Sequence, residues 1–489
     1  MGELVASGYT ARTVKDELRS NVVRMLASGE ELFPSIIGYE KSVVPGLVNA
    51  LLSRHDFILL GLRGQAKTRI LRSLVRFLDE WVPVLPDSPL NEDPLHPLTA
   101  AGHDRLRDGG DDTPIGWLHR DDRYQEKLAT PDVTIADLIG DIDPIKAATK
   151  RLDYSDEGMI HYGIIPRTNR GVFAINELPD LPPRIQVGLL NILEEKDFQI
   201  RGFPVRIPLD MSMVFSANPE DYTNRGNIIS PLKDRIDSQV ITHYPQDLDH
   251  AVQITRQEAW EDRRDQPPVP VPSYLRELIE EVAFEARESE FVDQKSGVSA
   301  RMTIALLENL ISNAERRALA TGDDADRQPR LTDLHQALTA ITGKLELVYE
   351  GEQEGPVLVA RKIIGQAVRR MFRRYFPKPD VKVRDGDDEP DEKSPYASIA
   401  KWFSAGNTIE TSDALSAADY YSRLGEVAGL QELARTGFEI EQPGEVALGM
   451  ELVLEGLHQH SMLSKRDLES STSYRDMLKA MFDQMAADE

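Results

Sequence analysis

The run from Phe57 to Arg69 constrains the fold of this chain more than any other segment. It reads Phe-Ile-Leu-Leu-Gly-Leu-Arg-Gly-Gln-Ala-Lys-Thr-Arg, an apolar stretch followed by a glycine-rich turn and then Lys67-Thr68. Glycines let a backbone curl so that successive N–H groups point inward, and a helix that follows adds the positive end of its dipole. The segment therefore predicts a buried strand, a phosphate-binding loop and a helix that begins near Lys67.

The spacing in this segment matches G-x-x-x-x-G-K-[ST], a loop that holds nucleotide triphosphates, at every position but one. Ala66 stands where the second glycine is usual. We expect Lys67 to reach the β- and γ-phosphates of ATP and Thr68 to contact Mg²⁺. The residues predicted to bind ATP in this loop are Gly61, Arg63, Gly64, Gln65, Ala66, Lys67, Thr68 and Arg69.

Length and composition limit the class of protein. A chain of 489 residues suggests about three units, and its formal charge of −25 argues against sequence-independent binding to DNA or to anionic membranes. The absence of cysteine excludes disulfides, thiolate metal sites and cysteine nucleophiles. Neither a signal-peptide pattern nor an apolar run of membrane-spanning length is present, so we expect a cytoplasmic protein with no membrane and no nucleic-acid partner.

The first half of the chain has the pattern of an α/β protein. Apolar runs at 172–176 and 211–217 predict buried parallel strands, and their alternation with helical patterns predicts a layered sheet within residues 1–245. Residues 82–112 are rich in Pro, Asp and Gly without sustained periodicity. They predict a mobile surface insertion over about 82–116.

The second half is predicted to be mostly helical. Residues 246–376 are expected to form a helical lobe, and the basic face of its last helix predicts side chains that are solvated or paired with acidic neighbours rather than nucleic-acid binding. Residues 377–395 have the composition of an acidic, disordered linker. Residues 396–489 predict a small helical domain that could recruit a partner.

Two further strands end in polar residues that suit an ATP-hydrolysing site. The strand over 171–176 is followed by Glu177, which we expect to orient and polarise the attacking water. Asn176 occupies the place of the usual metal-contacting Asp and offers an amide oxygen without charge, so Mg²⁺ affinity or catalytic rate is expected to suffer. Asn218 follows the strand over 211–217 and is expected to hold the water or the γ-phosphate from the opposite side.

Two arginines complete the predicted site. Arg235, on a short helix, could reach the nucleotide of the next protomer as an arginine finger. The alternative is a surface arginine paired with Asp234 or Asp237. Arg301 begins a helix of the lobe and could contact the phosphates from there, which would couple the nucleotide to the angle of the lobe.

The order and spacing of these segments resemble an AAA+ ATPase of the group that contains MoxR proteins and magnesium-chelatase subunit I, over roughly residues 20–376. Two segments, residues 130–143 and 163–172, are similar to runs of the chelatase subunit. Residues 183–195 look like the MoxR helix after the Walker-B strand, which is the strand over 171–176 in this chain. By the same resemblance, residues 198–207 would be a hairpin, and about 138–168 would be the helix-2 insert of this clade.

The resemblance implies an AAA+ parallel sheet flanked by helices and followed by a helical lid. It also implies a homo-oligomer, which would be a hexameric ring or open helix with ATP bound between subunits. This assembly would remodel a protein client or assist cofactor or metal insertion. The expected partner bears a von Willebrand factor A (VWA) domain. The matching motifs of the family imply the roles expected for Lys67, Thr68, Glu177, Asn218, Arg235 and Arg301.

Other interpretations of the sequence stay open. One is the ATPase subunit of a magnesium or cobalt chelatase, and another is a nucleotide-binding scaffold that does not hydrolyse ATP, which Asn176 motivates. A transcription activator of the enhancer-binding kind is disfavoured because the chain lacks the G-A-F-T-G-A loop. No protein metal site is predicted beyond the nucleotide-bound Mg²⁺.

Overall fold

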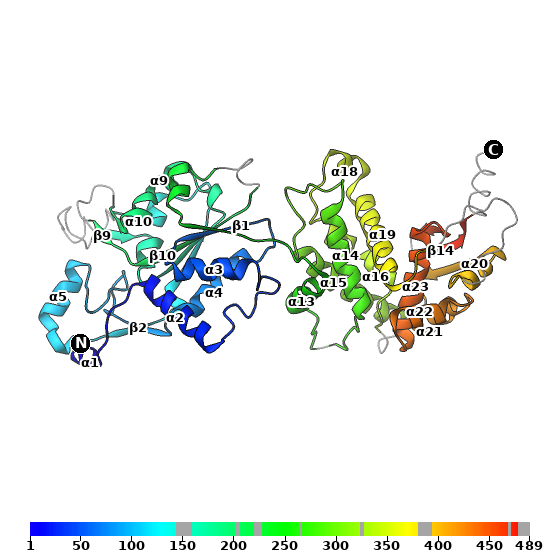
Figure 1. Ribbon diagram of the computed structural model, residues 1–489, viewed down its shortest axis with the longest axis horizontal. Helices are drawn as coiled ribbons and strands as arrows, with labels where there is room; N and C mark the ends of the chain where they lie inside the picture. Colours follow the sequence, from blue (N-terminus) through cyan, green and yellow to red (C-terminus); the bar gives the residue numbers. More distant parts are fainter. Residues whose placement is uncertain are drawn as a thin grey trace. The chain divides into compact units, whose positions relative to one another are not determined.

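The computed structural model describes residues 1–142, 159–200, 206–219, 227–264, 266–322, 327–379, 394–467 and 471–477. The chain divides into two compact units, Met1–Tyr244 and Pro245–Glu489, and each is described by itself (Figure 1). Most of the expected helix-2 insert, residues 143–158, and most of the expected linker, residues 380–393, lie outside the described residues. Within the described part of the chain, no helix is both long and apolar enough to cross a lipid bilayer.

A five-stranded parallel sheet forms the centre of the first unit, in the order β11-β1-β10-β7-β4. The strands are β1 (Phe57–Leu60), β4 (Tyr124–Leu128), β7 (Gly171–Asn176), β10 (Met211–Ala217) and β11 (Ser238–Ile241). Every residue of β7 and β10 is buried, because helices cover both faces of the sheet. The predicted α/β sheet flanked by helices is confirmed.

The two faces of the sheet belong to two separate hydrophobic cores, since successive strand residues point to opposite sides. Leu59 and Val214 pack under α2 (Val14–Ser28), α3 (Val43–Leu52) and α4 (Lys67–Ser73). Ile58 and Phe215 pack into the other core. That core includes residues of α6 (Ile135–Leu138), α8 (Ile164–Arg167), α9 (Pro183–Gly188), α10 (Leu190–Glu194) and α12 (Ser230–Arg235). Figure 1 shows α3 and α4 on one side of β1 and β10, with α9 and α10 on the other.

The segment 82–116, expected to be a mobile insertion, is instead regular over much of its length. It contains β2 (Trp81–Val84), α5 (Ala100–Gly109), the 3-10 turn η2 (Gly110–Asp112) and β3 (Gly116–His119). The Glu92 carboxylate is 1% exposed and accepts hydrogen bonds from the backbone N–H groups of Leu98 and Thr99, both at 2.6 Å, and from the Ser88 hydroxyl. A loop held by a buried carboxylate has no periodic pattern, which is why the sequence did not reveal its order.

Besides the antiparallel pair of β2 and β3, two small antiparallel strand pairs belong to this unit. β5 (Gly140–Ile142) pairs with β6 (Ile160–Tyr162) at the two ends of the expected insert. β8 (Asp197–Phe198) pairs with β9 (Ile207–Pro208), with Phe198 opposite Ile207, where the sequence predicted a hairpin.

The second unit is mainly helical and also contains a sheet. Its longer helices are α13 (Leu248–Glu258), α14 (Ser273–Glu288), α15 (Arg301–Thr321), α19 (Pro356–Tyr375) and α23 (Pro443–Gln459). The shorter helices are α16 (Leu331–Gln336), α17 (Leu338–Thr342), α18 (Tyr349–Glu354), α20 (Ala397–Ser404), α21 (Ala417–Gly425) and α22 (Leu430–Phe438). The strands β12 (Ile409–Ser412), β13 (Leu463–Asp467) and β14 (Ser471–Asp476) form an antiparallel sheet in the order β12-β14-β13. The sequence predicted only helices there, because these strands are short and largely polar.

One hydrophobic core joins the helical lobe and the C-terminal segment, which the sequence treated as two domains. Residues from Tyr274 to Tyr474 contribute to this core, and α23 is buried on all sides from Val446 to Leu457. Phe372 of α19 packs so closely on Gly456 of α23 that a Cβ atom there would lie 2.1 Å from its ring. Because α23 packs against α16 and α19 of the lobe and against α21 and α22 of the C-terminal segment, it ties both segments together.

Part of the basic face of α19 forms ion pairs with acidic neighbours, one of the two environments that the sequence predicted. Arg370 contacts Glu285 at 3.0 Å, and Arg374 contacts Glu277 at 3.1 Å, both on α14. Arg374 also pairs with Glu281.

Candidate nucleotide site

The predicted phosphate loop connects β1 to α4, and its backbone has the shape that the motif requires. Gly64 has φ +74° and Ala66 has φ +56°, both in the left-handed region. Glycine adopts this conformation without strain, whereas for Ala66 it costs about 1 kcal/mol because of its Cβ atom. Gly61 is required for a different reason, because a Cβ atom there would lie 1.9 Å from the Thr242 hydroxyl oxygen and 2.2 Å from the Gln65 amide oxygen.

Three side chains that the sequence did not single out hold this loop in place. The Thr242 hydroxyl, just after β11, donates to the Gln65 side-chain oxygen at 2.7 Å. The Tyr244 hydroxyl donates to the Arg63 carbonyl at 2.9 Å. The Tyr39 hydroxyl lies 3.1 Å from the Gln65 carbonyl and 2.6 Å from that of His243. Burial raises the pKa of Tyr39 to about 12, so its hydroxyl stays a donor at physiological pH.

Sequence alone gives no signal for these supports. Residues 39 and 242–244 are far from the loop along the chain, and only the position of β11 next to β1 brings residues 242–244 to it. Arg69, which was predicted to bind the nucleotide, lies on the first turn of α4 and has its guanidinium 3.4 Å from the Ser35 carbonyl.

Lys67 and Asn218 meet in the structure. The Lys67 ammonium donates to the Asn218 side-chain oxygen at 2.6 Å and to the Leu62 carbonyl at 2.8 Å, with a third bond to the Gly61 carbonyl. Three acceptors use all three protons of a lysine ammonium. The contact arises because β10 lies directly beside β1 in parallel, so that Asn218 after β10 and the loop after β1 share one edge of the sheet.

Glu177 follows β7, the next strand along the same edge. Its φ of +57° is uncommon for a residue with a side chain and turns the chain sharply after the strand. Its backbone N–H donates to the Ser216 hydroxyl at 3.4 Å. The strands β1, β10 and β7 lie side by side in this order. The residues that follow their ends therefore lie in one row, and they are Lys67 with its loop, Asn218 and Glu177.

Asn176 is buried, and its amide oxygen accepts a hydrogen bond from the Ser216 hydroxyl at 3.0 Å. Ser216 lies on β10, so this bond aligns the ends of the two strands. The sequence did not identify Ser216, because a serine within an apolar strand has no distinctive pattern. The Asn176 oxygen keeps a second lone pair for another contact.

Arg235, one of the two predicted arginines, is not part of this row. The Arg235 guanidinium, at the end of α12, is bound by the Glu194 carboxylate of α10, with Nε at 2.7 Å, rather than by Asp234 or Asp237. Arg301 is exposed and is the first residue of α15 in the second unit.

The residues of this site fit a nucleotide with Mg²⁺. Lys67 supplies a positive charge at the end of a loop whose Gly61 allows close backbone approach, and Thr68, half-buried on α4, supplies a hydroxyl. Mg²⁺ commonly takes only one or two protein oxygens and completes its shell with phosphates and water. Among the described residues there is no group of three or more His, Asp and Glu side chains that could hold a metal ion on its own.

Comparison with known proteins gives only distant structural likeness. No family model matches the chain, and no curated protein matches it. A chain of magnesium chelatase, from a complex of its subunits BchI and BchD, is 20% identical with a TM-score of 0.35, and the match covers 66% of this chain and 98% of that one. A Cytophaga hutchinsonii protein described as an ATPase is 16% identical with a TM-score of 0.31, with 73% and 96% covered. NtrX from Brucella abortus is 14% identical with a TM-score of 0.34, and the match covers 59% of this chain and 54% of NtrX, about half of its length.

Proposed function

We propose that this chain is a Mg²⁺-dependent AAA+ ATPase. The observation that carries the proposal is the contact of 2.6 Å between the Lys67 ammonium and Asn218, in one row with Glu177 at the ends of three adjacent parallel strands. A cation, an amide and a carboxylate in that order are the groups that hold phosphates and position a water for attack on the terminal one.

Each residue has a distinct task in this proposal. Lys67 exchanges its carbonyl partners for phosphate oxygens, which are stronger acceptors because they are charged. Asn218, already oriented by Lys67, contacts the γ-phosphate or the water, and Glu177 orients and polarises that water. Bound Mg²⁺ neutralises charge that develops on the phosphates. Thr68 would hold the ion, and Asn176 would do so with its remaining lone pair.

The experiment that tests this function is steady-state ATP hydrolysis with Mg²⁺, with Glu177→Gln measured in parallel. We expect phosphate release by the natural chain to exceed that of the variant by at least about 10²-fold, because the variant keeps the shape of the side chain but cannot polarise water. Equal rates in both proteins would contradict the role of Glu177 and reveal a contaminating ATPase.

The finer features of the proposal rest on the resemblance to the MoxR and magnesium-chelatase group. They are a cytoplasmic hexameric ring, a partner with a VWA domain, an unidentified protein client, and contacts to the nucleotide from Arg235 of a neighbouring subunit and from Arg301. Specific activity that rises with protein concentration would support assembly. Specific activity that is constant across a wide range of concentrations, with a monomeric mass, would contradict it.

A second candidate is a nucleotide-gated scaffold that does not hydrolyse ATP. It is favoured by Asn176, which is uncharged and already bound through its oxygen to Ser216. Asn176→Asp distinguishes the two functions. If the natural chain binds ATP without turnover and this variant gains turnover, the scaffold is the better description.

A further inference from the structure

The two-stranded ribbon of β2 and β3 presents an aromatic face that the proposed ATPase site does not use. In the antiparallel register, Trp81 lies opposite His119, and Pro83 lies opposite Trp117. Residues opposite each other in such a pair, and residues two apart along a strand, project to the same side. Trp81, Trp117 and His119 therefore share one face.

Both tryptophans are open to solvent. The exposed fractions are 52% for Trp81 and 59% for Trp117, and the Trp81 ring packs edge-on against His119 with the ring centres 4.8 Å apart. Of the four tryptophans in the chain, these two lie on neighbouring strands. An exposed pair of tryptophans on one face is typical of an interaction site.

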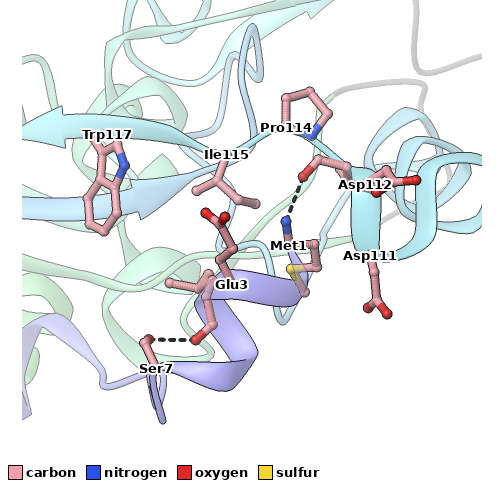
Figure 2. Close-up of a pocket in the computed structure, with 10 residues that line it drawn as sticks. Met1, Glu3, Ser7, Asp111, Asp112, Pro114, Ile115 and Trp117 are labelled. Carbon is pink, nitrogen blue, oxygen red and sulfur yellow. Dashed lines mark hydrogen bonds between the residues drawn. The ribbon is translucent and has the colours of Figure 1, made fainter.

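A cavity of about 530 Å³ adjoins Trp117, with α1 (Gly2–Ala6) on one side and the segment before β3 on the other. Leu4 and Ile115 are apolar residues of its lining, and the Met1 ammonium donates to the Thr113 carbonyl at 2.8 Å. Figure 2 shows the Glu3 carboxylate near Ile115, with Trp117 beyond it on β3. The aromatic face and the cavity thus share Trp117.

Three exposed carboxylates line this cavity, those of Glu3, Asp111 and Asp112. None of them pairs with a cationic side chain in the part of the chain that the structure describes. The three carboxylates and the Trp117 ring line one cavity, which suits a segment with lysine or arginine, because carboxylates attract the cationic group and the face of an indole ring attracts it as well.

We propose that the β2–β3 ribbon and the adjoining cavity bind an extended, lysine- or arginine-bearing segment of a partner protein. Apolar side chains of the segment enter the cavity over Leu4 and Ile115, and its cations lie against Trp117 and the three carboxylates. The carboxylates repel nucleic acid. A second copy of this chain, with a formal charge of −25, is repelled as well. Nothing in this proposal depends on ATP binding.

The test is fluorescence anisotropy with a labelled 12-residue peptide of alternating Lys and Val, and with the matched peptide of alternating Glu and Val. We expect the basic peptide alone to bind the full chain, and to bind more weakly as salt is raised. The double variant Trp81→Ala/Trp117→Ala should weaken binding about tenfold or more. Glu3→Gln/Asp111→Asn/Asp112→Asn, which keeps the side-chain shapes, should weaken it to a similar extent.

Trp260→Ala is the matched control, because Trp260 is 64% exposed but Arg263 already covers its ring at 4.9 Å. It should bind the basic peptide as the natural chain does. Undiminished binding in both multiple variants, or equal binding of the acidic peptide, would overturn the proposal. So would a dimer in sedimentation that the tryptophan substitutions dissociate, since the face would then belong to a second copy.

Discussion

Lys67 is the residue whose loss should affect nucleotide binding most directly. Lys67→Ala removes a cation with three hydrogen bonds, and we expect ATP affinity to fall by about 10 to 100-fold, since a hydrogen bond to a charged group contributes about 1.5–3 kcal/mol. Calorimetric titration with ATP measures this. Arg72→Ala is the control, because Arg72 is on the same helix but pairs with Glu126. Undiminished binding to Lys67→Ala would contradict the phosphate-loop assignment.

At the scale of elements, a buried carboxylate links three helices of the second unit. Glu280 of α14 accepts a hydrogen bond from the Thr255 hydroxyl of α13 at 2.5 Å, and Thr255 lies 3.0 Å from the Thr303 hydroxyl of α15. Glu280 is 4% exposed, and desolvation raises its pKa from 4.5 to about 7. The folded state therefore prefers the protonated carboxyl, and the contribution of Glu280 to stability is fully present below pH 4.5 and is lost as pH rises through 7.

This linkage gives a pH-dependent prediction. Relative to Glu280→Gln, which stays neutral, the natural chain should lose on the order of 2 kcal/mol of unfolding free energy between pH 5 and pH 8. Urea unfolding followed by circular dichroism at both pH values measures the difference. Glu288→Gln, at the exposed end of the same helix, should keep the pH dependence of the natural chain. The same pH dependence in Glu280→Gln would show that this carboxyl does not carry the effect.

At the scale of the whole molecule, Arg235 tests whether subunits complete each other's sites. Arg235→Ala should lower turnover by roughly 10³ to 10⁵-fold with ATP binding intact, if this guanidinium acts on a neighbouring nucleotide. Within one chain Arg235 is held by Glu194. Glu194→Gln should therefore leave turnover unchanged or raise it, because it releases the arginine. Phosphate release by both variants above the assembly concentration gives the answer, and unchanged turnover in Arg235→Ala would contradict the finger.

The sequence by itself determined the elements whose signal is local. The strand, glycine-rich turn and helix around Lys67 appear where the pattern predicted them, as do the buried strands that precede Glu177 and Asn218. That these segments meet at one site could be expected only through the family resemblance, because the order of motifs along the chain does not give the order of strands in the sheet. The tertiary structure decided that β10 lies between β1 and β7 and so brings Asn218 to Lys67.

Contacts between distant segments decided the rest. Tyr39, Thr242 and Tyr244 support the phosphate loop through hydrogen bonds that no sequence period encodes. The order of segment 82–116 depends on the buried Glu92, and the union of the lobe with the C-terminal segment depends on the burial of α23. Local patterns reflect what each segment exposes and buries along its own axis, whereas hydrogen bonds across long chain separations exist only once the chain is folded.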